Sequence, residues 1–124
     1  MTGGPIKATG ADTAGVYAVV EFSAPPDDIP PPRHLHRRTT ESFYVIEGAL
    51  SITLDDREVR ADAGCFVTVA PGVVHTFAVC GPVPARFLVI VSPPELLGFF
   101  EQMLDMPGRE HPGPYDIEIV EDAR

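Results

Sequence analysis

The sequence predicts an all-β protein, a jelly-roll barrel followed by one short C-terminal α-helix. Short runs rich in Val, Ile, Thr and Phe follow one another between residues 15 and 92, with turn residues such as Pro71-Gly72 between them. Strands at this regular spacing are typical of β-barrels and sandwiches, and a jelly roll is their natural arrangement here. A chain of 124 residues with 44% hydrophobic residues can fill one core, so we expect a single domain.

The strands are expected to follow one another between a short arm and a tail. Residues 1–13 are the N-terminal arm, residues 14–105 the barrel with its helix, and residues 106–124 the C-terminal tail. The expected strands, each a β-favouring run between turn residues, are residues 15–23, 35–37, 42–47, 50–54, 58–60, 65–70, 75–80 and 86–92. A last such run in the tail, residues 116–120, is expected to pair with an exposed sheet edge or with a second subunit.

One helix is expected after the barrel. Ser92-Pro93-Pro94-Glu95 has the capping-box pattern with proline in the first turn, and Pro107-Gly108 ends the segment. Apolar side chains recur at helical spacing between these limits, at Leu96, Phe99, Phe100 and Met103. We expect this apolar stripe to pack on the outside of the barrel or at a dimer contact.

Three of the four histidines gather in two short segments that also hold a carboxylate, and together they indicate a metal site. His34 and His36 are two residues apart, so their imidazoles share one face of a strand. Glu41 lies an odd number of residues from His36, so a turn at residues 37–40 must precede the strand that it opens. His75 follows a Pro-Gly turn and arrives from a third strand. We therefore predict that two adjacent strands supply three metal ligands and a third strand supplies His75.

These segments resemble the paired motifs of the cupin superfamily. The first motif fits His34, His36, Glu41 and Gly48, and the second fits Gly64, Pro71, Gly72 and His75. The resemblance extends over residues 14–105 and implies a double-stranded β-helix, the jelly-roll cupin barrel. Ser92-Pro93 with Phe99-Phe100 also resembles a bacterial subgroup of small single-domain cupins related to quercetin dioxygenase.

The chemistry of the four side chains predicts a reactive metal centre. Three imidazoles and one carboxylate suit one divalent transition metal, Fe, Mn, Ni, Cu, Co or Zn, with one or two coordination positions left open. A ligand carboxylate can also detach and take a proton, so Glu41 is expected to be both metal ligand and catalytic base.

Strand alternation predicts an apolar wall beside this centre. Phe43 and Val45 share the face of Glu41, while Phe77 and Val79 share the face of His75, and we expect these four to bind substrate. Such a wall favours an aromatic or otherwise hydrophobic small molecule. The leading interpretation is a dioxygenase or other oxygenase of an aromatic, enolic or diketone-like substrate that chelates the metal. A redox-neutral isomerase, cyclase or lyase is the second, and a non-catalytic small-molecule-binding cupin is the third.

Composition argues against several other classes of protein. A formal net charge of −9 repels nucleic acid and anionic membranes, and no helical segment outside residues 14–105 could form a DNA-binding unit. The N-terminus has no apolar signal region and no long apolar run occurs, so we expect a cytoplasmic protein. A homodimer is expected as well, because a small barrel leaves sheet edges that need covering.

The remaining reactive side chains are given structural roles. Cys65 and Cys80 each lie in an apolar strand-like run, so we expect buried free thiols. His111 stands between Glu110 and Pro112 in the Gly/Pro-rich tail and is expected to be a loop residue.

Overall fold

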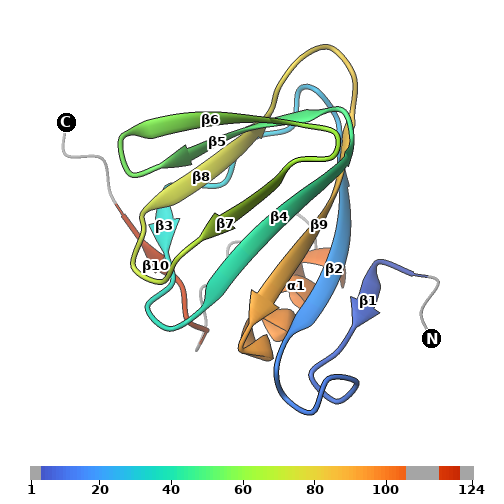
Figure 1. Ribbon diagram of the computed structural model, residues 1–124, viewed down its shortest axis with the longest axis vertical. Helices are drawn as coiled ribbons and strands as arrows, with labels where there is room; N and C mark the ends of the chain where they lie inside the picture. The colour runs from blue at the N-terminus through green and yellow to red at the C-terminus, as the bar shows by residue number, and fades with distance from the viewer. Residues whose placement is uncertain (1–3, 106–114, 121–124) are drawn as a thin grey trace.

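The predicted all-β fold is confirmed: the chain forms a double-stranded β-helix of two five-stranded antiparallel sheets (Figure 1). The computed structural model describes residues 4–105 and 115–120, with side chains for all of these except residues 103–105. Sheet A has the strand order β1-β2-β9-β4-β7 and sheet B the order β10-β3-β8-β5-β6. The expected end of the helix at Pro107-Gly108 and the expected loop at His111 lie outside the described residues.

The strands follow the predicted β-favouring runs closely. They are β1 (Ile6–Ala8), β2 (Ala18–Ala24), β3 (His34–Leu35), β4 (Thr40–Glu47), β5 (Ala49–Leu54), β6 (Arg57–Asp62), β7 (Phe66–Val69), β8 (His75–Val79), β9 (Ala85–Ser92) and β10 (Glu118–Ile119). Strand β1 lies inside the expected N-terminal arm and was not predicted as a strand. Strand β10 pairs with β3 of the same chain. Of the two partners expected for the terminal run, it therefore has the sheet edge.

Alternation along the strands builds the core between the two sheets. Phe87, Val89 and Val91 of β9 are buried, and Phe43 and Val45 on the neighbouring strand β4 are buried beside them. Because side chains two apart share a face, this inward face of β4 begins with a polar residue, the buried Glu41. The core packing of sheet A therefore points a carboxylate into the barrel.

A short helical segment follows β9 and closes one side of the barrel. It consists of the 3-10 turn η1 (Pro94–Leu96) and helix α1 (Leu97–Asp105). The helix packs on the inner side of sheet A, where the Phe100 ring lies 5.6 Å from that of Phe22, so the expected position outside the barrel is wrong. No helix in residues 4–105 and 115–120 has the length and apolar character needed to span a bilayer.

Two local predictions fail at the ends of strands. Ser92 does not cap the helix: its hydroxyl donates to the carbonyl of Val16 at 2.7 Å, and the N-cap position is occupied by Pro93 without a side-chain hydrogen bond. Cys65 and Cys80 are free, as predicted, but Cys65 is exposed and Cys80 half-buried. Both cysteines stand just outside their strands, so the inward alternation does not reach them.

Candidate metal centre

The four predicted ligand residues come together inside the barrel, but from strands arranged differently than expected. His34 on β3 lies directly opposite His75, the first residue of β8. His36 follows β3, and after the predicted turn Glu41 enters on β4. The expected adjacency of the first two ligand strands is wrong, because β3 and β4 belong to different sheets. Sheet B thus brings the three imidazoles, and sheet A brings the carboxylate across from them.

The ligand atoms of these residues converge on one small volume. One ligand atom from each of His34, His36, Glu41 and His75 lies within 4.8 Å of all the others. The His36 and His75 Nε2 atoms stand 3.1 Å and 2.9 Å from the same carboxylate oxygen, Oε1 of Glu41. His75 is 1% exposed and Glu41 5% exposed, so these two side chains are shielded from bulk water.

Each imidazole is oriented by a backbone carbonyl at its other nitrogen. The Nδ1 atom of His34 lies 2.7 Å from the Pro32 carbonyl, and that of His75 lies 2.9 Å from the Val73 carbonyl. The Nδ1 atom of His36 lies 2.7 Å from the carbonyl of Asp116, eighty residues away. A ring nitrogen that faces a carbonyl must donate, so each neutral ring keeps its lone pair on Nε2, where a metal ligand needs it.

This arrangement fits a bound cation. In neutral rings, the Nε2 lone pairs of His36 and His75 would both face a Glu41 oxygen, and acceptors without a hydrogen between them repel. A proton on each ring, or a cation among the ligand atoms, makes the contact favourable. Three nitrogens and one carboxylate oxygen form a donor set that divalent transition metals accept. The cluster can therefore bind a divalent metal.

The cluster also shifts the protonation of its members. Burial, and then the charge of His75, lowers the pKa of His34 to about 4. Burial alone would raise the pKa of Glu41, but hydrogen bonds from His36 and His75 outweigh it and lower that pKa to about 2. Burial works against a charge on His36, yet the hydrogen bond and charge of Glu41 raise its pKa overall. At neutral pH the carboxylate is therefore ionised and His34 is neutral.

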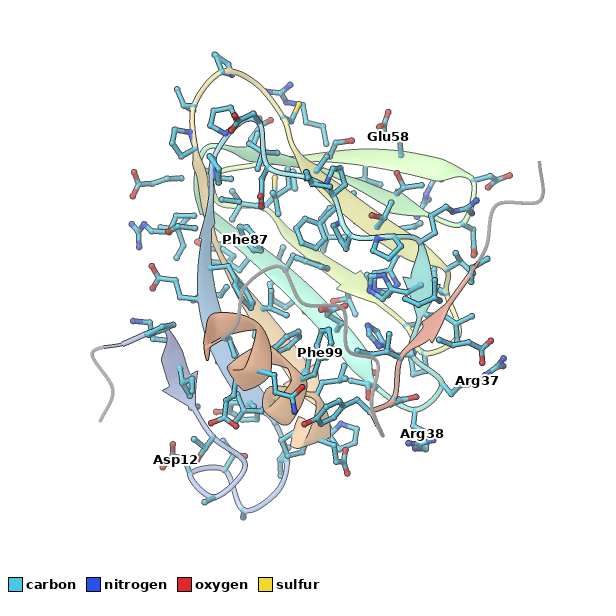
Figure 2. All side chains as sticks on the ribbon, turned by 180° about the vertical axis from the view of Figure 1, so that it is seen from behind. Asp12, Arg37, Arg38, Glu58, Phe87 and Phe99 are labelled. Carbon is cyan, nitrogen blue, oxygen red and sulfur yellow. The ribbon has the colours of Figure 1, made fainter. Side chains whose placement is uncertain are left out.

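Aromatic side chains fill the barrel beside the cluster. The rings of Phe43 on β4 and Phe77 on β8 lie 5.3 Å apart, and Phe87 packs against both at 6.2 Å and 5.6 Å. Val45 is buried and Val79 half-buried on the same inner faces. Figure 2 shows Phe87 inside the barrel and Arg37 and Arg38 projecting outward at its rim. Sequence reasoning overlooked Phe87, although the alternation of β9 would have placed it inward.

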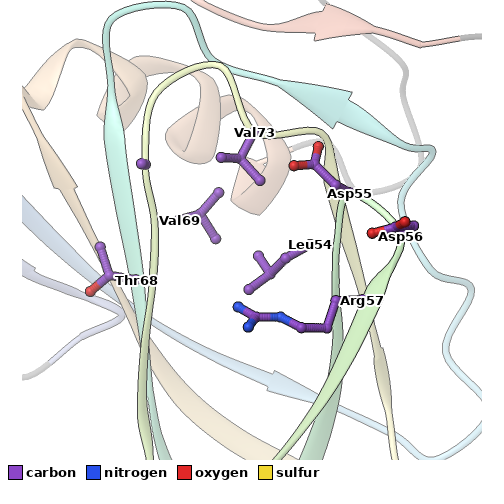
Figure 3. A pocket seen from close by; sticks show the side chains of 8 residues that line it. Leu54, Asp55, Asp56, Arg57, Thr68, Val69 and Val73 are labelled. Atoms are coloured by element: carbon purple, nitrogen blue, oxygen red, sulfur yellow. The ribbon is translucent and has the colours of Figure 1, made fainter.

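A groove of about 320 Å³ opens beside the ligand strands, between the β5–β6 turn and the loop before β8 (Figure 3). Its lining residues are Leu54, Asp55, Asp56, Arg57, Thr68, Val69, Ala70 and Val73. Leu54 is the cross-strand partner of His75, and Val69 is that of Glu41. The groove thus brings solvent next to two ligand strands, and its residues were not singled out from the sequence.

Comparison with known proteins decides the family. A family model described as a cupin domain matches residues 20–91, more than half of the chain. The chain belongs to the cupin family. This cupin is 32% identical over 72 residues to quercetin 2,3-dioxygenase from Bacillus subtilis (strain 168), a match that covers 58% of the chain and 21% of the relative. It spans about a fifth of that relative's length.

Solved structures share the fold of this cupin at low sequence identity. An uncharacterized conserved protein with a double-stranded beta-helix domain from Klebsiella pneumoniae is 19% identical with a TM-score of 0.65, and the match covers 98% of this chain and 89% of that one. The polyketide cyclase RemF from Streptomyces resistomycificus is 24% identical with a TM-score of 0.58, covering 74% of this chain and 70% of that one. Both likenesses concern the fold alone.

Proposed function

We propose that this cupin is a metal-dependent oxygenase, a dioxygenase of a small aromatic, enolic or diketone-like molecule. His34, His36, Glu41 and His75 hold one divalent ion, and Phe43, Val45, Phe77 and Val79 contact the substrate. The observation that carries the proposal is the convergence of three imidazoles and one carboxylate, all within 4.8 Å, beside an aromatic wall.

In this proposal the metal, Glu41 and the aromatic side chains have different roles. A bound metal supplies an open position for a chelating substrate and, when redox-active, the means to use O₂. Glu41 is ionised at neutral pH because its pKa is about 2, so its oxygen is free to take a proton. A carboxylate with so low a pKa is a weak base, and it would accept the hydroxyl or enol proton only from a substrate made more acidic by chelation to the metal. The Phe43 and Phe77 rings make the barrel interior beside the cluster apolar, which keeps water away and favours an aromatic substrate. O₂ is the second substrate and adds to the deprotonated one.

The quercetin 2,3-dioxygenase relative supports the choice of oxygenase. It is 32% identical to this chain over 72 residues, a stretch of the same length as the cupin domain match. The cytoplasmic location expected from the sequence stays a prediction.

Oxygen consumption with a chelating substrate tests the proposal. Protein loaded with Fe(II), Mn(II), Ni(II), Cu(II) or Co(II) is mixed with a flavonol or an aromatic diketone, and dissolved O₂ and product are followed together. We expect O₂ uptake matched to substrate loss with at least one of these ions and none with Zn(II), because zinc has no redox chemistry. Glu41→Gln is the control, since an amide still ligates weakly but cannot accept a proton.

Other outcomes point to the other two interpretations. Equal conversion with and without O₂ would contradict the oxygenase and favour isomerase, cyclase or lyase chemistry. Tight substrate binding without conversion, for every ion, would favour a non-catalytic binding protein.

A further inference from the structure

The C-terminal strap, which we define as residues 115–120, reaches the ligand cluster from far along the chain. Strand β10 within it pairs with β3, so that Ile119 lies opposite His34 and Glu118 opposite Leu35. The Val120 amide donates to the Arg33 carbonyl at 2.8 Å and extends the contact past the strand. The strap therefore forms the outer edge of sheet B along the strand that bears the first ligand.

Asp116 touches the cluster through its backbone. Its carbonyl accepts from Nδ1 of His36 at 2.7 Å. His34 and His75 donate the equivalent bond to the carbonyl of the residue two positions before them, whereas His36 donates it to the strap. The tautomer and orientation of His36 thus depend on a segment that is remote in sequence.

The side chain of Asp116 holds the loop that joins two ligands. Its carboxylate accepts from the amides of Arg37 and Arg38 and from the hydroxyl of Thr39, each at 2.8 Å. This side chain is 6% exposed, and Thr39 is fully buried. These three residues span most of the connection from His36, just after β3, to Glu41 on β4. One residue therefore orients His36 through its carbonyl and fixes the ligand loop through its carboxylate.

Helix α1 anchors the strap at its other end. The Tyr115 ring lies 5.9 Å from that of Phe99, and its hydroxyl accepts from the Gln102 amide at 3.2 Å. A side chain at Gly98 would come within 3.0 Å of the Tyr115 ring, so helix and strap approach closely. Asp116 is thus held from both sides.

We propose that Asp116 is a positioning residue of the metal centre, and that the C-terminal strap sets how tightly the centre binds its ion. The inference rests on the proposed metal site and assigns to it a residue outside the ligand motifs. Partners that orient a ligand histidine affect metal affinity about 10–100-fold when they are removed.

Cobalt binding to full-length variants tests this inference. The dissociation constant for Co(II) and the visible spectrum at saturating Co(II) are measured for wild type, Asp116→Ala and Asp116→Asn. Asp116→Ala keeps the backbone carbonyl that faces His36, but it removes the carboxylate that fixes both the strap and the loop between His36 and Glu41. We expect the constant to rise about 10–100-fold, with a shifted spectrum because the ligands that this loop joins are less well oriented. Asp116→Asn keeps an acceptor oxygen, so it should recover part of the affinity, and it carries the test should the alanine variant not fold.

Two control variants separate positioning from stability. Glu118 lies on the same strap and forms an exposed ion pair with Arg37. Glu118→Gln weakens this pair and should change the Co(II) dissociation constant by less than about fivefold. Val20→Ala loosens the buried core of β2 and should lower stability while leaving the cobalt spectrum unchanged. Equal affinity and equal spectra in wild type and both Asp116 variants would overturn the inference alone. Failure of wild type to bind Co(II) would overturn the proposed function and the inference with it.

Discussion

At the scale of single residues, the candidate centre depends on where each imidazole nitrogen points. All three histidines turn Nδ1 toward a carbonyl, which leaves Nε2 for the cluster. Because Glu41 comes from the opposite sheet, the ligand set exists only when the two sheets are packed. Metal binding and native packing should therefore stabilise each other.

Substitution of one ligand histidine should empty the site without unfolding the barrel. His75→Ala removes a buried nitrogen donor, one of the four clustered ligand groups, so we expect metal content well below one ion per chain. Elemental analysis after dialysis measures the content, and circular dichroism reports the fold. His111→Ala is the matched control, since that histidine has no part in the ligand motifs. Full metal content in His75→Ala would contradict the ligand assignment.

The metal-free protein should lose stability in mild acid through His34. The unfolded chain takes up a proton on this histidine near its ordinary pKa of 6.5, whereas the folded chain resists until about pH 4. Protons therefore favour the unfolded state as the pH falls through this window, by about 2 kcal/mol at pH 5. Urea unfolding of metal-free wild type and His34→Gln at pH 7 and pH 5 measures the difference. An identical decrease in both proteins would contradict this origin.

The sequence predicted which four side chains cluster, but it did not predict the groups that support them. Residue type and spacing were sufficient for His34, His36, Glu41 and His75, because local motifs carry the donors. The orientation of His36 could not be predicted, because its carbonyl partner belongs to Asp116 and no local pattern joins the two. The sheet arrangement of β3 and β4 was likewise hidden, since spacing alone does not reveal which strands pair across a turn.

At the scale of elements, strand interiors followed the predictions and element ends did not. Alternation placed β4 and β9 correctly because inward side chains must be apolar where the sheets pack. The predicted capping box does not form, because Ser92 is still part of β9 and its hydroxyl donates a hydrogen bond to the Val16 carbonyl instead. Local patterns at element ends compete with long-range contacts that the sequence does not display.

The turn between β4 and β5 should be far less tolerant of substitution than other glycine turns. Gly48 has φ of +74°, and a Cβ there would collide with the Pro84 carbonyl oxygen and lie 2.9 Å from Ala85 Cα. Gly48→Ala should therefore lower the free energy of unfolding by about 3 kcal/mol or more, from strain and overpacking together. Thermal and urea unfolding measure it.

Gly64→Ala provides the matched control for that turn. Gly64 also has positive φ, +92°, but a Cβ there meets nothing within 4 Å. Strain alone should cost about 1–2 kcal/mol in this variant. Equal losses in the two variants would show that the close approach of Pro84 is unimportant.

At the scale of the whole molecule, the net charge disfavours self-association, whereas one face of the surface favours it. The net charge of −9 opposes association of like copies, yet sheet A carries exposed aromatic residues on its outer face. Tyr44 and Phe66 lie opposite each other there, and Tyr44 also lies opposite Leu88. Ion pairs that Arg86 makes with Glu47 and Glu21 neutralise charge at the border of this face.

We predict that two copies of the chain associate through this outer face of sheet A. Exposed aromatic groups with a polar border are typical of protein interfaces, and a two-fold axis would stack the Tyr44 and Phe66 pairs of both copies.

Light scattering at micromolar concentration should give twice 13.4 kDa for wild type. Phe66, 59% exposed, is the residue to change: Phe66→Lys should give the mass of one chain, because an ammonium group would have to lose its water to enter the interface. Ile29→Lys alters a side chain that is 87% exposed but lies in the loop before β3, so this control should stay dimeric. A wild-type mass of one chain would refute the dimer, and a dimeric Phe66→Lys would exclude this face as the interface.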